Sequence, residues 1–95
     1  MMRLIVTWCP SFAAVDDARR LGHMVEMCLC DHTAITVEVH ELVFDRGLNP
    51  QHRIRGKIVT GHGEGSTFAG RFNDVGAGIF DTVDEPIARQ PAQAR

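Results

Sequence analysis

The chain has 95 residues, of which 44% are hydrophobic and 23% charged, and this balance predicts one small globular domain. Its formal net charge of -2 gives no long-range attraction for phosphate backbones, so a nucleic-acid partner is not expected. No apolar run approaches the roughly 20 residues that cross a bilayer, and three cysteines without a secretion signal do not suggest a disulfide framework. We therefore expect a cytoplasmic protein without membrane contacts.

A strand and a long helix are predicted first. Residues Arg3 to Trp8 are apolar on both faces, which is typical of a central strand. Pro10 suits the first turn of a helix, and apolar residues then recur at three- and four-residue steps, which predicts an amphipathic helix of about 18 residues. Gly22 lies inside it, where glycine costs roughly 1 kcal/mol relative to alanine. The apolar stripe consists of Val15, Ala18, Leu21, Val25, Cys28 and Leu29.

The rest of the chain is predicted to form strands. Thr33 to Phe44 alternates between apolar and polar residues, with a shift near Glu41 that indicates a bulge or a strand end. Turn-forming residues occupy Asp45 to Pro50, and the glycines between Thr60 and Ser66 predict a hairpin loop with positive φ angles. The later strands are predicted at Arg53–Thr60, Ser66–Phe72 and Gly78–Val83.

These elements predict an α+β fold in one domain, residues 1–84, followed by a flexible tail, residues 85–95. One amphipathic helix packs on a four- to five-stranded, mostly antiparallel sheet in the order β-α-β-β-β-(β). A parallel pairing of the first two strands through the helix is compatible with this order. Because an open sheet exposes unpaired N–H and C=O groups at its edges, we also expect a homodimer formed through a sheet edge.

Cys9 stands where the first strand meets the helix. A thiol at a helix N-terminus faces the positive end of the helix dipole, which favours the thiolate. The stretch Trp8 to Pro10 resembles the active-site turn of thioredoxin- and glutaredoxin-like proteins, with Phe12 in the place of the second cysteine. Pro50 lies near the place of their cis-proline. The resemblance implies a monothiol redox protein using Cys9, which is the alternative to a structural cysteine. Cys28, at roughly 28 Å along the predicted helix, is too distant to pair with it.

Cys28 and His32 form a possible half-site for zinc. Residues four apart on a helix share a face, so this pair could bind one ion. Two more ligands are needed, and the spacing of the remaining histidines is not typical of zinc sites: His23, His40, His52 and His62. We therefore expect no metal and no cofactor, and a zinc-stabilised domain is kept as a further alternative.

Positive charge is concentrated on one face of the strand Arg53–Thr60. If this strand pairs with Thr33–Phe44, its basic side chains and two polar ones share a solvent-exposed face. They then either form cross-strand ion pairs or contact an acidic partner or a nucleic acid. The tip of the glycine loop is a second candidate surface, because anchored loops often carry function. The candidate binding residues are Glu38, His40, Arg53, Arg55, Lys57, His62 and Glu64.

Sets of residues typical of catalysis do not stand out, so a binding role is favoured over an enzymatic one. We expect a small non-enzymatic protein-binding module that acts as a regulator or inhibitor of a macromolecular partner, of the kind that phage or mobile-element genes encode. The expected partner is a protein.

Overall fold

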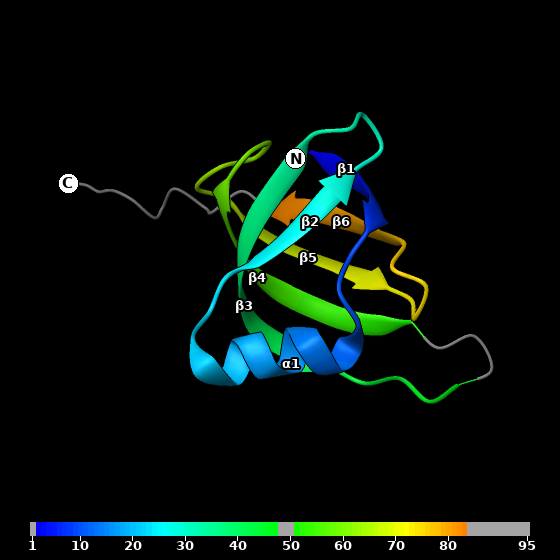
Figure 1. Cartoon of the computed structure of the whole chain (residues 1–95). Helices are drawn as coiled ribbons and strands as arrows, with labels where there is room; N and C mark the ends of the chain where they lie inside the picture. The colour runs from blue at the N-terminus through cyan, green and yellow to red at the C-terminus, as the bar shows by residue number, and fades with distance from the viewer. Residues whose placement is uncertain (1, 48–50, 84–95) are drawn as a thin grey trace.

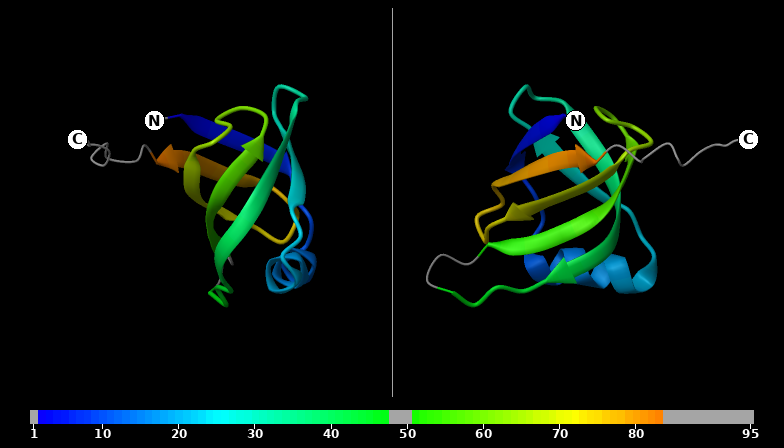
Figure 2. Two further views of the ribbon diagram at one scale, coloured as in Figure 1. Left: turned by 90° about the vertical axis from the view of Figure 1, so that its left-hand side faces the viewer. Right: turned by 180° about the vertical axis from the view of Figure 1, so that it is seen from behind.

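The computed structural model describes residues 2–47 and 51–83, whose strands close into an antiparallel barrel (Figure 1). Each strand pairs with the next one along the chain, and the last returns to pair with the first. Figure 2 shows the barrel from two further sides, with the helix at the lower end of the barrel in both views. The elements are β1 (Arg3–Trp8), α1 (Phe12–Leu21), β2 (Val25–Leu29), β3 (Ala34–Val43), β4 (His52–Thr60), β5 (Thr67–Phe72) and β6 (Gly78–Val83).

The predicted α+β fold, an open sheet with a helix on one face, is wrong. The second half of the predicted helix is strand β2, which completes a closed barrel of six strands in the described part of the chain. β1 and β2 are antiparallel, so the parallel pairing is also wrong. Because β1 pairs with β6, the described strands leave no open edge of the kind on which the expected homodimer depended. The homodimer itself stays a prediction.

The helix ends early because Gly22 stops it. At the start of α1, the hydroxyl of Ser11 accepts a hydrogen bond from the Ala14 N–H at 3.2 Å, as an N-cap residue does. At its end, Gly22 has a φ of 75°, in the left-handed region that favours glycine. The following N–H, of His23, donates to the carbonyl of Ala18 at 2.8 Å and closes a Schellman motif. The chain is then free to enter β2.

Strand periodicity replaces helix periodicity after this turn. Val25, Met27 and Leu29 point into the barrel and are buried, whereas Cys28 is exposed. The placement of Cys28 on a buried stripe is therefore wrong. Leu21, assigned to the same stripe, is 67% exposed at the end of α1.

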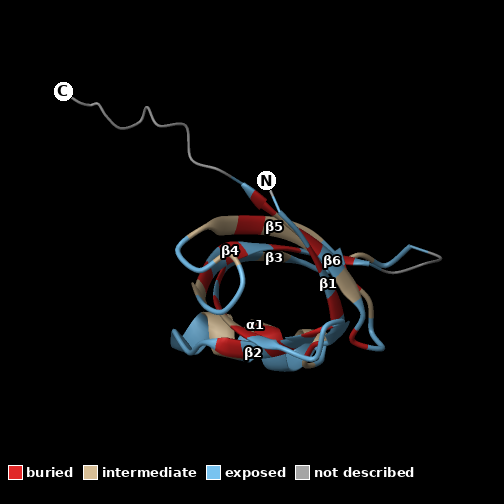
Figure 3. Cartoon of the chain, turned by 90° about the horizontal axis from the view of Figure 1, so that it is seen from above, coloured by how far each residue is buried: buried red, intermediate tan, exposed pale blue. Residues whose placement is uncertain are grey.

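Inward-facing side chains of all six strands fill the barrel together with Val15 of α1. Figure 3 views the barrel from above and shows buried positions alternating with exposed ones along the strands. The predicted alternation in β3, β4 and β5 is confirmed, and so is the register shift in β3, which lies between Val39 and Glu41. The largest buried side chains include Phe68, Phe72, Phe80, Met27, Ile35, Ile54 and Ile58.

Some predictions lie outside the described residues. They are the predicted tail, residues 85–95, the domain boundary at 84, Pro50 and the rest of the turn at 48–50. Within residues 2–47 and 51–83, no helix is long and apolar enough to cross a bilayer.

Candidate functional site

The register of the barrel arranges its outward side chains in rows that run across the strands. Opposite partners on neighbouring strands have Cβ atoms about 4.5–5.5 Å apart, so members of a row contact one another. One row, here called the arginine row, consists of Val43, Arg53, Arg71, Ile79 and Ile5. The adjacent row, here called the ion-pair row, consists of Glu41, Arg55, Ala69, Asp81 and Arg3.

Each carboxylate of the ion-pair row forms an ion pair with an arginine of the same row. Arg55 Nε lies 3.1 Å from Glu41 Oε1. On the other side of Ala69, the guanidinium of Arg3 donates to both oxygens of Asp81, at 2.8 and 3.2 Å. The hydrogen bonds and charge of Arg3 hold the pKa of Asp81 below its ordinary value. Both carboxylates of this face are therefore already committed to arginines of their own row.

Two positive charges of the arginine row have no ion-pair partner in the described part of the chain. Arg53 and Arg71 are direct opposite partners on β4 and β5, and both are exposed. Within residues 2–47 and 51–83, neither forms an ion pair with a carboxylate. Like charges placed directly opposite one another destabilise a sheet. Among the described residues, the pair therefore has no carboxylate partner, and both side chains are exposed to solvent.

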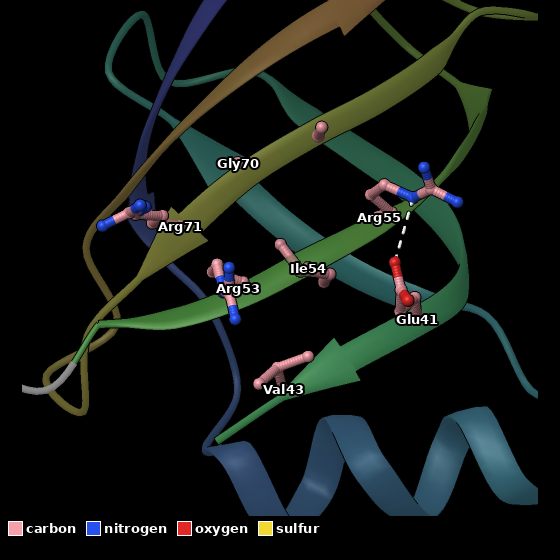
Figure 4. A pocket seen from close by; sticks show the side chains of 8 residues that line it. Glu41, Val43, Arg53, Ile54, Arg55, Gly70 and Arg71 are labelled. Carbon is pink, nitrogen blue, oxygen red and sulfur yellow. Dashed lines mark ion pairs between the residues drawn. The ribbon is translucent and has the colours of Figure 1, made fainter. Parts of the chain in front are cut away.

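A groove of about 430 Å³ lies between the arginines on the outside of β3, β4 and β5 (Figure 4). Ala69, in its floor, presents only a methyl group, so the space between the long side chains stays open. A second groove, of about 470 Å³, shares Arg71 and continues over the apolar side chains of Ile5 and Ile79. The first groove is lined by Glu41, Val43, Arg53, Ile54, Arg55, Ala69, Gly70 and Arg71.

The structure brings some of the predicted binding residues together and separates others. Arg53 and Arg55 both line the groove. Lys57 is exposed further along β4, opposite Glu38 in register. The carboxylate of Glu38 lies 2.9 Å from Nε2 of His40, so these two side chains engage each other outside the groove.

The loop between β4 and β5 lies at the end of the barrel opposite α1 (Figure 1). Its predicted positive φ angles are confirmed at all three glycines between Thr60 and Ser66. Nε2 of His62 lies 3.0 Å from Asp31 Oδ2, which ties the loop to the turn between β2 and β3. The pKa of Asp31 is lowered, first by the hydroxyl of Thr33. Glu64 is exposed at the tip of the loop.

Cys9 is a buried thiol, not a helix-terminal one. It is 5% exposed, and burial raises its pKa to about 12. α1 begins at Phe12 behind the cap formed by Ser11. The separation predicted between Cys9 and Cys28 is wrong, because Cys28 lies opposite Trp8 in the β1–β2 pairing. Cys9 and Cys28 nevertheless differ in exposure, since one is buried and the other faces solvent, and both are free thiols.

The helix on which the predicted zinc half-site depended ends at Leu21, before Cys28 and His32. Cys28 is in β2, whereas His32 is in the turn that follows, so the four-residue spacing does not place them on one face. The described residues contain no group of three or more histidine, cysteine or acidic side chains that could hold a metal ion.

His52, considered in the sequence only as a further zinc ligand, is completely buried at the start of β4. Its ring lies against three phenyl rings, with centroid distances of 4.7 Å to Phe12, 4.8 Å to Phe44 and 5.3 Å to Phe72. Nε2 lies 2.5 Å from Asp74 Oδ1, and Nδ1 accepts from the Asp45 N–H at 3.4 Å. Because both ring nitrogens are engaged, we interpret this histidine as structural.

Sequence reasoning missed Arg71. It alternates with the inward Phe72 and Gly70, a signal that places it on the outer face. Its position opposite Arg53 follows only from the β4–β5 register. Comparison of the chain with models of protein families, with curated proteins and with solved structures finds no match.

Proposed function

We propose that the chain is a small, non-enzymatic protein-binding module that regulates or inhibits an acidic protein partner, and that it contacts this partner through the arginine row. The observation that carries the proposal is the Arg53–Arg71 pair, two opposed cations for which the described residues provide no counter-charge. Arginine forms strong, bidentate hydrogen bonds with acidic groups and is enriched at protein interfaces.

The neighbours of the pair support contact with a protein. Val43 is 38% exposed, Ile79 is 48% exposed, and Ile5 beside it is 40% exposed. A partner that covers the row would bury these apolar side chains around the two charges. Interfaces have this composition, in which arginine and apolar anchors lie together at the centre.

The thiol-dependent alternative receives less support. A nucleophilic or redox-active cysteine requires an accessible thiolate at neutral pH. Cys9 is enclosed in the core, where burial raises its pKa to about 12 and keeps the thiol protonated.

The test is capture of a partner from the native host, followed by titration of the purified partner. The double variant Arg53→Gln/Arg71→Gln removes both charges and leaves both ion pairs of the neighbouring row in place. Arg20→Gln is the control for loss of an exposed arginine elsewhere, because Arg20 lies in α1 outside the grooves and its ion pairs, with Asp16 and Asp17, are within the helix. Circular dichroism and thermal melting establish that each variant is folded.

We expect the double variant to lose the partner and the control to retain it. Binding of the purified partner to the unmodified chain should weaken as salt is raised, because exposed charges are screened within about 8 Å at physiological ionic strength. Retention of the partner by the double variant would show that another surface makes the contact.

A further inference from the structure

We infer that the Arg53–Arg71 pair is a binding site for a phosphorylated serine or threonine side chain of the protein partner. The inference rests on the proposed function and names the chemical group that the arginine row recognises.

Charge matching distinguishes a phosphate from a carboxylate at this position. A phosphorylated side chain carries about -1.5 to -2 charges at pH 7, whereas aspartate and glutamate carry one. The Arg53–Arg71 pair has two positive charges, because Glu41 and Asp81 are held by Arg55 and Arg3. One carboxylate would leave part of the repulsion between the guanidinium groups in place. A phosphate dianion neutralises both.

The geometry also suits a group with several acceptor oxygens. Arg53 and Arg71 extend outward from directly opposite positions on adjacent strands, so side chains of equal length begin about 5 Å apart. Each guanidinium presents its N–H donors as a planar fork, and a phosphate presents three oxygens that can accept from both forks at once. Figure 4 shows Arg53 and Arg71 on the outer face at neighbouring positions of β4 and β5, with the end of the Arg71 side chain turned away from Arg53.

The surroundings favour a phosphorylated protein over other sources of phosphate. The pair is flanked by Val43 and Ile79, and the second groove beside Arg71 runs over Ile5. A peptide chain has apolar side chains next to its phosphorylated residue that can fill these positions. A nucleic acid offers one charge per phosphate and calls for basic residues along a longer track. An anionic bilayer attracts clusters of four to eight basic residues, and this row has two.

The experiment uses the full chain and three degenerate libraries of 11-residue peptides, with a fixed phosphoserine, glutamate or serine at the centre and mixed polar and aliphatic flanks. Fluorescence polarisation measures binding, and backbone amide shifts locate it. We expect the phosphoserine library to bind at least about tenfold more tightly than the glutamate library. A phosphate can accept charge-assisted hydrogen bonds from both arginines, whereas a single carboxylate pairs with one. Arg71→Gln should abolish this preference, and Arg20→Gln should leave it unchanged.

Lowering the pH from 7.5 to 5.5 gives a second readout. The second pKa of the phosphate is about 6, so its dianion is lost over this range. Affinity for the phosphoserine library should fall accordingly, whereas affinity for the glutamate library should not.

Equal affinity for the phosphoserine and glutamate libraries would overturn the phosphate inference and leave the acidic-partner proposal intact. Tighter binding of an 11-residue oligothymidylate, or of vesicles containing one quarter phosphatidylserine, would overturn it in favour of those ligands. Failure of both acidic libraries to exceed the serine library would contradict the phosphate inference. If the captured partner were also retained by Arg53→Gln/Arg71→Gln, the proposed function would fail as well.

Discussion

Replacement of His52 by alanine should destabilise the protein more than any change on its surface. The ring is 0% exposed and is enclosed by the rings of Phe12, Phe44 and Phe72. Phe12 begins α1, Phe44 directly follows β3, and Phe72 ends β5. His52 therefore joins the helix to the barrel wall. Without the ring, three aromatic contacts are lost and a cavity remains at the end of the barrel near α1.

The size of the effect follows from what the ring contacts. Truncation of a buried aromatic residue to alanine costs about 3–5 kcal/mol, and the smaller imidazole places His52 near the lower value. The hydrogen bond to Asp74 adds little, because the side chain of Asp74 is 60% exposed and water can replace the histidine. We therefore expect a loss of about 3 kcal/mol, a large part of the 5–15 kcal/mol that stabilises a typical domain.

Urea unfolding followed by circular dichroism measures this loss. His52→Phe is the matched control, since it retains an aromatic ring and removes only the hydrogen bonds, and it should cost about 1 kcal/mol. If His52→Phe were as unstable as His52→Ala, the hydrogen bonds to Asp74 and Asp45 would be the main contribution. The packing argument would then be refuted.

Three further predictions concern a tight strand contact, a buried thiol and an ion pair. Gly70→Ala places a Cβ 2.3 Å from the carbonyl oxygen of Ile79, so we expect a loss of about 1–3 kcal/mol in urea unfolding, whereas Ala69→Gly on the outer face should cost less. Iodoacetamide at pH 8 should modify two thiols in the native protein and all three in urea, because burial raises the pKa of Cys9 to about 12, and intact mass counts the adducts. Asp81 has a lowered pKa in the folded state, so it stabilises the fold above its unfolded pKa of about 3.9 and loses this effect as the pH falls through the folded value. The stability difference between the unmodified chain and Asp81→Asn should accordingly be larger at pH 7 than near pH 2; an unchanged difference would contradict it.

The boundaries of most strands could be predicted from local patterns, but the division between α1 and β2 could not be settled by apolar spacing. Val25, Cys28 and Leu29 fit a helix, whereas Val25, Met27 and Leu29 fit a strand equally well. Gly22 holds the deciding signal. Glycine destabilises the interior of a helix, so Gly22 is expected directly after the last helical turn. There its positive φ angle ends α1.

Closure of the barrel could not be predicted from local sequence patterns, because it depends on a long-range strand pairing. The pairing of β1 with β6 joins residues more than 70 positions apart, such as Ile5 and Ile79, and no turn sequence connects them. The number of strands decides whether a twisted sheet has enough width to close. Because β2 was assigned to the helix, the predicted sheet was one strand short, and an open sheet with free edges followed from that single error.

In the candidate site, local patterns predict which side chains face outward, but the strand register decides which of them lie opposite one another. Alternation alone places Arg53 and Arg55 on the outer face, and this was correct. Whether an arginine forms an ion pair depends on which residue lies opposite it on the neighbouring strand. Glu41 meets Arg55 only because the shift near His40 changes the register of β3, and Arg53 meets Arg71 only through the β4–β5 pairing. The charged patch was therefore predictable, but its uncompensated part was not.

The position of this pair on a closed barrel bears on its role. The interior is filled mainly by apolar side chains, and the neighbouring carboxylates pair with Arg3 and Arg55. Two arginines in direct opposition therefore repel each other without an ion-pair partner among the described residues, and such like-charge pairs destabilise a sheet. A ligand that neutralises both charges removes this cost on binding. If the proposed ligand binds, part of its binding free energy would come from relief of this repulsion, and occupation of the arginine row would stabilise the barrel.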